Sequence, residues 1–235
     1  MNDLIKYKIF PLGDNAVTIN FGNIINEDIN KEVIARFNQL QQQPLPGVIE
    51  TVPAYSSLTV YYDVFSLKKT VPAGISLFDY MKQLLDKKLQ EPAQEHLIAE
   101  RVMKVPVCYE TGFAADIKQL ALAKNISIEE VIQIHTSKMY KVYMLGFLPG
   151  FPYMGELDEK IAMPRKPQPV NIAAGSVGIA GKQTGIYPLD SPGGWQIIGR
   201  TPLQLFDGTK EEATLLRAGD TVQFYSISKD EFQNY

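Results

Sequence analysis

The sequence predicts two domains: an α+β domain over residues 1–98, with a ferredoxin-like order of elements, and a mainly-β barrel or sandwich domain over residues 99–235. Strand and helix patterns alternate through the first hundred residues, whereas short apolar runs broken by Gly and Pro dominate after residue 140. The segment 90–100 is polar and contains Pro92, which makes it the best candidate for the boundary. A chain of 235 residues is long enough for one large or two ordinary domains.

The elements of the first domain follow from hydrophobic periodicity. Apolar and polar residues alternate over 17–21, which indicates a half-buried strand, and apolar residues then recur at helical spacing until Pro44. Ser76 is the predicted cap of a later helix, with Asp79 three residues on as a weaker capping box. The expected elements are strands at 7–10 and 17–21, a helix at 29–40, strands at 47–55 and 58–62, a helix at 77–88 and a strand at 102–107. From the second strand onward the order is β-α-β-β-α-β, which suggests a ferredoxin-like domain, and the last strand can belong to either side of the boundary.

The second domain is expected to begin with two short helices and to continue as strands. Asn125 is the expected stop of a helix at 116–123, and Ser127 with Glu130 makes a capping box for the next helix. Apolar runs that indicate strands lie at 140–148, 170–180, 195–198, 203–206 and 221–227, the last after a turn at 218–220. Such runs are typical of an all-β barrel or sandwich.

Composition excludes several classes of function. The net charge of −3 and the pI near 5.5 argue against a nucleic-acid-binding surface, and Glu129 and Glu130 would repel phosphates from the helix that Ser127 caps. No apolar run approaches the roughly 20 residues of a membrane-spanning helix, and no signal peptide is indicated. The single cysteine, Cys108, excludes an internal disulfide, so we expect a cytoplasmic protein, without nucleic-acid or membrane partners, in which Cys108 is buried.

The segment 146–202 is the strongest candidate for a binding or catalytic surface. It holds 10 of the 17 glycines and 8 of the 15 prolines, yet it is also rich in aromatic and branched apolar residues, unlike a disordered linker. Tyr187 and Trp195 offer ring faces to a ligand or partner, although Trp195 fits a core equally well. We therefore expect shaped loops on a packed surface.

The isolated charges of this segment are its candidate polar groups. Between residues 170 and 199 the only charged residues are Lys182 and Asp190, and Arg200 follows. Asp190 can act as a base or bind a hydroxyl, and Arg200 can grip a carboxylate or phosphate; the alternatives are a capped turn and a local ion pair. Lys182 can hold an anion in a turn together with Thr184. The alternative is that Lys182 is an exposed loop lysine.

Motifs for phosphate loops, serine nucleophiles and metals do not fit. Ser176 and Gln183 stand where a P-loop requires Gly and Ser or Thr, and Ser176 also lacks the strand-to-helix context of a nucleophile elbow. Of the two histidines, His96 lies in the polar linker and is expected at the surface. His135 is either a general base or a helix-end histidine that bonds terminal carbonyls. These residues with Cys108 make no metal constellation, so no metal site is predicted.

Three long motifs in fixed order resemble a bacterial family. The first runs from Leu145 through Pro149-Gly150-Phe151-Pro152 to Tyr153, the second covers 174–188, and the third runs from Ser191 through Gly193-Gly194-Trp195 to Pro202. The family is that of the B subunit of 5-oxoprolinase, also called KipI-like or allophanate-hydrolase-subunit-1-like. The resemblance covers nearly the whole chain and implies a cyclophilin-like β-barrel as the second domain.

The resemblance also implies an activity that depends on partners. The B, C and A subunits of 5-oxoprolinase together open 5-oxo-L-proline to L-glutamate while ATP is hydrolysed to ADP and phosphate. ATP is then a co-substrate of the complex, and no cofactor bound to this chain is predicted. The alternatives are a KipI-type inhibitor of a sporulation histidine kinase and a component of an allophanate or urea amidolyase-type amide hydrolase.

The resulting predicted site is the following. Asp190 and His135 are the candidate catalytic residues. The candidate substrate- or nucleotide-binding residues are Arg165, Lys182, Gln183, Thr184, Tyr187, Trp195 and Arg200. One departure from the family pattern lies between Arg165 and Ala174, where relatives often carry a second Pro-Arg pair and this chain has Pro167-Gln168. A role played by that second arginine in relatives is therefore in doubt here.

Overall fold

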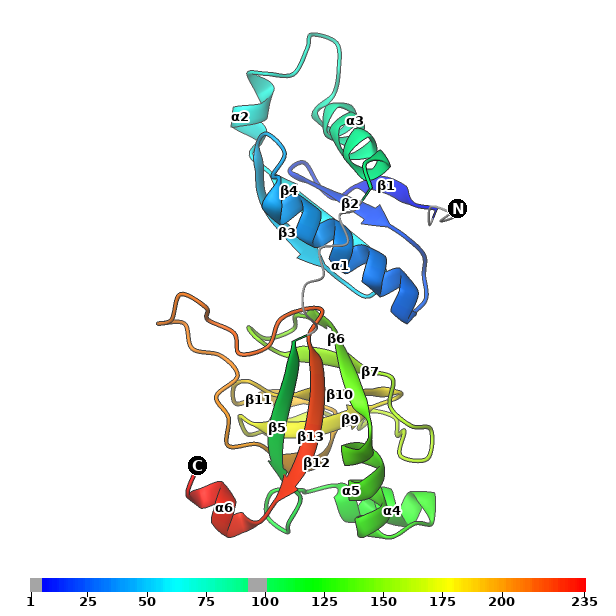
Figure 1. Cartoon of the computed structure of the whole chain (residues 1–235), viewed down its shortest axis with the longest axis vertical. Helices are drawn as coiled ribbons and strands as arrows, with labels where there is room; N and C mark the ends of the chain where they lie inside the picture. The colour runs from blue at the N-terminus through cyan, green and yellow to red at the C-terminus, as the bar shows by residue number, and fades with distance from the viewer. Residues whose placement is uncertain (1–5, 93–100) are drawn as a thin grey trace. The chain divides into compact units, whose positions relative to one another are not determined.

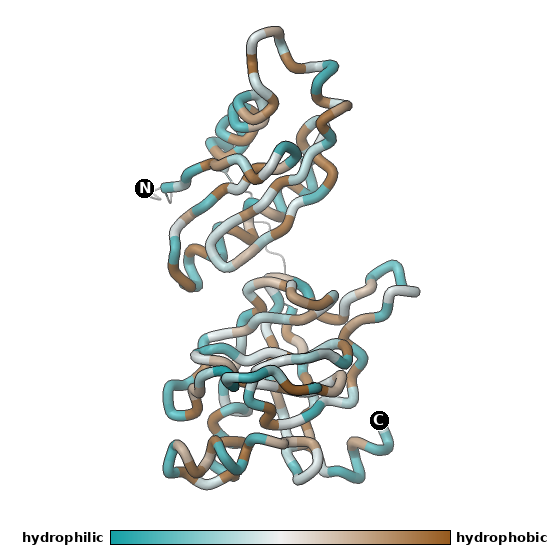
Figure 2. The backbone as a smooth tube through the Cα atoms, turned by 180° about the vertical axis from the view of Figure 1, so that it is seen from behind, coloured by the Kyte–Doolittle hydropathy of each residue, from teal (hydrophilic) through white to brown (hydrophobic). Residues whose placement is uncertain are grey.

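The computed structural model describes residues 6–92 and 101–235 and divides into two compact units, Met1–Ile98 and Ala99–Tyr235 (Figure 1). The predicted boundary segment and His96 fall largely outside the described residues. In both units hydrophobic and hydrophilic residues alternate along the chain, as Figure 2 shows. None of the described helices is long and apolar enough to span a membrane.

The first unit is an antiparallel sheet in the order β1-β2-β4-β3, covered by helices. Its elements are β1 (Lys8–Pro11), β2 (Ala16–Asn20), α1 (Glu27–Gln42), β3 (Val48–Pro53), β4 (Ser57–Tyr62), α2 (Val64–Lys68) and α3 (Leu77–Gln90). The predicted alternation is confirmed, because Val17 and Ile19 are buried opposite Val60 and Leu58 of β4. Their side chains pack with those of α1 and α3 in one hydrophobic core.

The ferredoxin-like order is not completed within this unit. The strand expected at 102–107 is β5 (Val102–Cys108), and it lies in the barrel of the second unit. Within the first unit, β1 instead occupies the edge of the sheet beside β2, with Ile9 opposite Ile19. The short strand expected at 7–10, which stands outside the ferredoxin-like order, is therefore part of the sheet.

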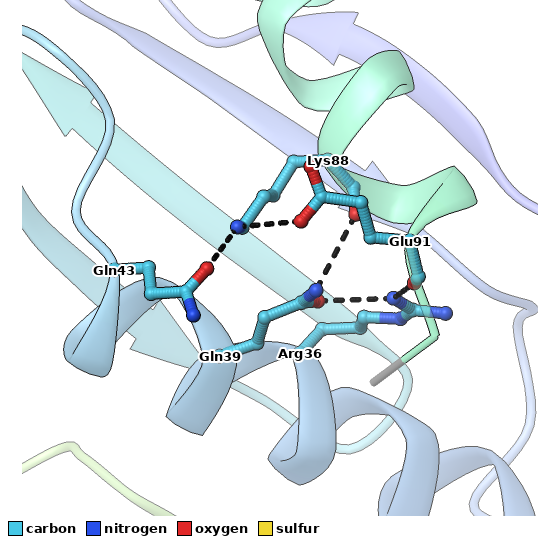
Figure 3. A network of polar contacts seen from close by, with 5 residues as sticks. All are labelled: Arg36, Gln39, Gln43, Lys88 and Glu91. Atoms are coloured by element: carbon cyan, nitrogen blue, oxygen red, sulfur yellow. Dashed lines mark hydrogen bonds and ion pairs between the residues drawn. The ribbon is translucent and has the colours of Figure 1, made fainter. Parts of the chain in front are cut away.

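A polar network joins α1 to the end of α3 (Figure 3). Lys88 donates to Glu91 at 2.7 Å and to Gln43, while the Arg36 guanidinium donates to the Glu91 carbonyl at 2.8 Å and to Gln39 at 2.9 Å. The side chains of Arg36 and Lys88 are almost wholly buried, and such charges require partners. The network therefore explains why Lys88 lies on the buried stripe of α3.

The second unit is a closed barrel in the order β10-β7-β6-β13-β5-β12-β9, as the resemblance implies. A small sheet pairs β11 with β8 beside it. After β5, the elements are α4 (Ile117–Lys124), α5 (Ile128–Ser137), β6 (Met139–Leu145), β7 (Pro152–Gly155), β8 (Val170–Ile172), β9 (Ser176–Ala180), β10 (Gln183–Ile186), β11 (Ser191–Gly193), β12 (Gln196–Arg200), β13 (Thr221–Ile227) and α6 (Lys229–Gln233). Cys108 is fully buried, as predicted.

The local predictions for this unit mostly agree with the structure. Asn125 ends α4 in the left-handed conformation, and Ser127 and Glu130 form the capping box of α5. The run at 170–180 is divided between β8 and β9 by a turn. The strand expected at 203–206 is wrong, because Phe206 makes only an isolated bridge to Thr214.

Candidate functional site

The segment 146–202 builds a cluster of aromatic rings around Phe151, called here the aromatic cluster. Phe151 is fully buried, and its ring centre lies 4.8 Å from that of Tyr153, 5.1 Å from Tyr187, 5.3 Å from Trp195 and 5.7 Å from Phe147. Most of these ring pairs meet edge to face, an arrangement that aromatic quadrupoles favour. The cluster belongs to a hydrophobic group that is separate from the main core of the barrel.

Glycines in the family motifs make this close packing possible. A Cβ at Gly185 would lie 2.9 Å from ring atoms of Phe151 and Trp195, and one at Gly193 would overlap the Tyr187 hydroxyl. A Cβ at Gly194 would contact the carbonyl oxygen of residue 166 at 3.4 Å. The glycines therefore allow the rings and loops of the cluster to approach one another.

Phe147 is the exposed member of the aromatic cluster, and its backbone is strained. Its side chain is 63% exposed, and its φ of 68° lies in the left-handed region that residues other than glycine avoid. The Leu148 N–H donates to the Gly146 carbonyl at 2.9 Å, and this bond closes a γ-turn around Phe147. With a positive φ at its central residue, it is of the type that is rarer than the inverse γ-turn. The turn leaves the ring exposed, and the ring stands perpendicular to the rings of Phe151 and Tyr187.

We expect Phe147→Gly to be more stable to urea than Phe147→Ala by about 1 kcal/mol. Both variants lose the ring, but only glycine relieves the left-handed backbone, which costs about 1–2 kcal/mol for other residues. Leu122 is the matched control: it is similarly exposed but lies in α4, where Gly should be about 1 kcal/mol less stable than Ala. The same order of stability at both positions would contradict the assigned strain.

Arg165 lies over the ring of Trp195, with its guanidinium carbon 5.9 Å from the ring centre. Trp195 is 4% exposed, whereas Arg165 is exposed and, among the described residues, has no carboxylate partner. Burial raises the pKa of Tyr153 and of Tyr187, and the nearby charge of Arg165 partly opposes both shifts. The guanidinium therefore stands close to two tyrosines of the cluster.

The backbone on either side of Arg165 is anchored. The Pro164 carbonyl accepts from the Gln196 side chain at 2.9 Å, and the Lys166 N–H donates to the Gly194 carbonyl at 2.7 Å. The Lys166 ammonium forms an ion pair at 2.7 Å with Asp116, where the side chains are 18% and 12% exposed. Asp116 also accepts from the Ile197 N–H at 2.6 Å, so this pair joins the start of α4, the 164–166 segment and β12.

Asp190 and Arg200 both bind the backbone of Ala174. The Asp190 carboxylate accepts from the Ala174 N–H at 2.7 Å, and the Arg200 Nε donates to the Ala174 carbonyl at 2.8 Å. The Arg200 guanidinium also lies 6.0 Å from the ring centre of Phe232 in α6. The two side chains therefore brace the turn between β8 and β9, and within the described part of the chain Arg200 forms no ion pair with an acid.

Lys182 stands at the hairpin between β9 and β10 and pairs with Glu159. Both side chains are exposed, and the hydrogen bond from Lys182 to Glu159 raises the pKa of the lysine. Gln183 follows at the start of β10 and is half-buried. In this structure the ammonium of Lys182 is thus bound to a carboxylate of the chain itself.

His135 and Thr184 lie inside the barrel, fully buried. The Thr184 hydroxyl donates to the Gly178 carbonyl at 3.1 Å, so it accepts from Nε2 of His135 at 3.0 Å, and Nδ1 accepts from the Tyr109 hydroxyl at 2.8 Å. Burial lowers the pKa of His135 to about 3, and the ring stacks on Phe224. The expected bonds from this side chain to helix-end carbonyls are not made, and no face of the neutral ring meets solvent.

The structure therefore brings together three of the predicted residues, Arg165, Tyr187 and Trp195, and separates the others into three places. The sequence did not indicate Asp116 and Lys166 as site residues, because Asp116 has the position of a helix start and Lys166 lies outside the nearly uncharged stretch 170–199. Nor did it indicate the exposed Phe147. Among the described residues, no group of three or more His, Cys, Asp or Glu side chains is placed to hold a metal ion.

Comparisons with known proteins match almost the whole chain. The family model described as "Carboxyltransferase domain, subdomain C and D" matches residues 7–216. The chain is 48% identical over 233 residues to the protein named as the B subunit of 5-oxoprolinase in Bacillus subtilis (strain 168), a match that covers 98% of this chain and 97% of the relative.

Two crystal structures share the fold within longer chains. That of TTHA0988 superposes with a TM-score of 0.77 at 34% identity and covers 91% of this chain but 40% of that one. That of the K. lactis urea amidolyase gives 0.76 at 21% identity and covers 100% of this chain but 16% of that one. The second likeness establishes a common fold only.

Proposed function

The chain belongs to the family described as carboxyltransferase domain, subdomain C and D, and on this premise we propose that it is one component of an ATP-dependent 5-oxoprolinase complex. Its reaction is the hydrolysis of 5-oxo-L-proline to L-glutamate. The observation that carries the proposal is the 48% identity, over nearly all of both chains, to a relative named as the B subunit of 5-oxoprolinase. The partners proposed are the C and A subunits of that enzyme.

The chemistry of the reaction explains why ATP is needed. A lactam carbonyl is a poor electrophile, and phosphorylation of its oxygen by ATP activates it and creates a leaving group. Water then adds to that carbon, and the C–N bond breaks to release the amine and leave an acyl phosphate. A second water hydrolyses the acyl phosphate to the carboxylate and phosphate. One 5-oxoproline, one ATP and two waters thus give glutamate, ADP and phosphate.

The described residues of this chain suit one part of that task. Lys166 and Lys182, two cations of the 146–202 segment, are paired with carboxylates of the chain itself, and Arg165 is available above the aromatic cluster. A single guanidinium beside aromatic rings is suited to holding and orienting an anionic group rather than to transferring a phosphoryl group. We therefore place this chain as one wall of a composite site.

Reconstitution tests the proposal directly. The chain is co-expressed with the homologues of the A and C subunits from its own genome, and glutamate release from 5-oxoproline is measured with and without ATP. We expect glutamate only when all chains and ATP are present, with the chain inactive alone.

Two other outcomes would replace this function with an alternative. If the complete set of chains were inactive while this chain alone blocked a histidine kinase's autophosphorylation, the KipI-type regulator would be favoured. Turnover of allophanate but not of 5-oxoproline would favour the amidolyase-type alternative.

A further inference from the structure

We propose that Arg165 and Trp195 form a binding site for the carboxylate of a small, flat ring, the chemical class to which 5-oxoproline belongs. The inference rests on the function proposed above and deepens it, because it assigns substrate recognition to this chain. It follows from three observations: Arg165 has no carboxylate partner among the described residues, its backbone is anchored, and aromatic rings lie beside it.

Arg165 differs in its partners from four other cations of the barrel unit. Lys166 and Arg101 pair with largely buried carboxylates, and Lys182 and Arg217 pair with exposed ones. Among the described residues Arg165 has no such partner, and its contact is with the Trp195 ring. A guanidinium on an aromatic face keeps its fork of N–H donors free at the edge, where a carboxylate can accept two parallel hydrogen bonds.

The backbone that carries this guanidinium is ordered before any ligand arrives. Residues 164 and 166 are each held by hydrogen bonds with the 194–196 segment, and Lys166 is held in addition by the largely buried Asp116. Arg165 is the one residue between these two anchors. Because the backbone is already ordered, binding loses less conformational freedom than it would in a mobile loop.

The charge and shape of the site select a small carboxylate. A nucleotide triphosphate carries several negative charges and is ordinarily held by a lysine and backbone amides in addition to a metal ion, whereas the neighbouring cation, Lys166, is already neutralised by Asp116. One unpaired guanidinium matches one carboxylate. Phe147, the exposed ring of the aromatic cluster, offers a flat surface against which a planar lactam can pack.

The experiment uses Trp195, the single tryptophan of the chain, as a reporter at the site. 5-Oxoproline is titrated into the complete complex, in which any tryptophans of the partner chains have been replaced. Trp195 emission is followed, and binding is also measured by calorimetry. We expect a saturable change in Trp195 emission, and Arg165→Met should weaken binding about tenfold or more, since it removes the hydrogen bonds between the guanidinium and the carboxylate. Arg165→Lys should be intermediate, because it keeps the charge without the fork.

Arg217→Met is the matched control, since it removes an exposed guanidinium of the same barrel unit that is paired with Glu212. It should bind 5-oxoproline as the parent does. A response to ATP with none to 5-oxoproline would overturn the carboxylate assignment. Unchanged 5-oxoproline turnover and binding in Arg165→Met would overturn the inference and leave the proposed function standing, whereas an inactive parent complex would remove the function itself.

Discussion

Gly175→Ala should be among the most damaging single-atom changes in the barrel, with an expected loss of roughly 2 to 5 kcal/mol in the free energy of unfolding. Gly175 has a φ of 81°, and a Cβ there would overlap the carbonyl oxygen of Thr201. The backbone cannot move aside easily, because its N–H donates to the Tyr187 carbonyl at 2.7 Å and its carbonyl accepts from the Thr201 N–H at 2.9 Å. Urea unfolding followed by Trp195 emission measures the loss.

Gly181→Ala separates the cost of the left-handed backbone from the cost of the clash with Thr201. Gly181 also has a left-handed backbone, with a φ of 60°, but a Cβ there would meet no atom within 4 Å. It should therefore cost only the backbone term, about 1–2 kcal/mol. Equal losses at the two positions would mean that the clash with Thr201 is relieved by a shift and that the turn braced by Asp190 and Arg200 is not rigid.

The sequence was informative where structure depends on near neighbours in the chain. The capping box of Ser127 and Glu130 and the left-handed stop at Asn125 are recognisable within a few residues, and both are confirmed. The allocation of β5 depends on its parallel pairing with β13, which runs from Val102 opposite Thr221 to Cys108 opposite Ile227. Periodicity carries no information about a partner so far along the chain. The predicted ferredoxin-like order therefore included a strand that belongs to the barrel.

The candidate site shows the same limit. The density of Gly, Pro and aromatic residues located the aromatic cluster, because close ring packing needs glycine at positions such as 185 and 193. A charged residue that is isolated in the sequence can still have a partner in the folded chain. Lys182 is paired with Glu159, and Asp190 binds the backbone of Ala174. Arg165 and Lys166 are adjacent in sequence, and only the fold shows that Lys166 is paired with Asp116 and Arg165 with no carboxylate among the described residues.

We expect His135 to make the stability of the barrel fall as the pH is lowered through the mildly acidic range. Its pKa in the folded protein is about 3, against 6.5 for an ordinary histidine, because the buried ring cannot be protonated without losing solvation. Folding therefore favours the neutral form, and this contribution is fully present above about pH 6.5 and is lost as the pH falls toward 3. The expected loss is about 1.4 kcal/mol for each pH unit below 6.5, since only the unfolded chain then gains the proton.

His135→Gln is the comparison that isolates this effect, because a glutamine side chain does not titrate while the carboxylates and His96 remain in both proteins. The variant should be less stable than the parent at about pH 7.5, because Tyr109 and Thr184 lose their well-placed partner in the barrel interior. Between about pH 7.5 and 5.5, however, the parent should lose about 1.4 kcal/mol more than the variant in urea unfolding. Parallel pH profiles would mean that the ring is protonated in the folded state, and would return His135 to consideration as a solvent-accessible base.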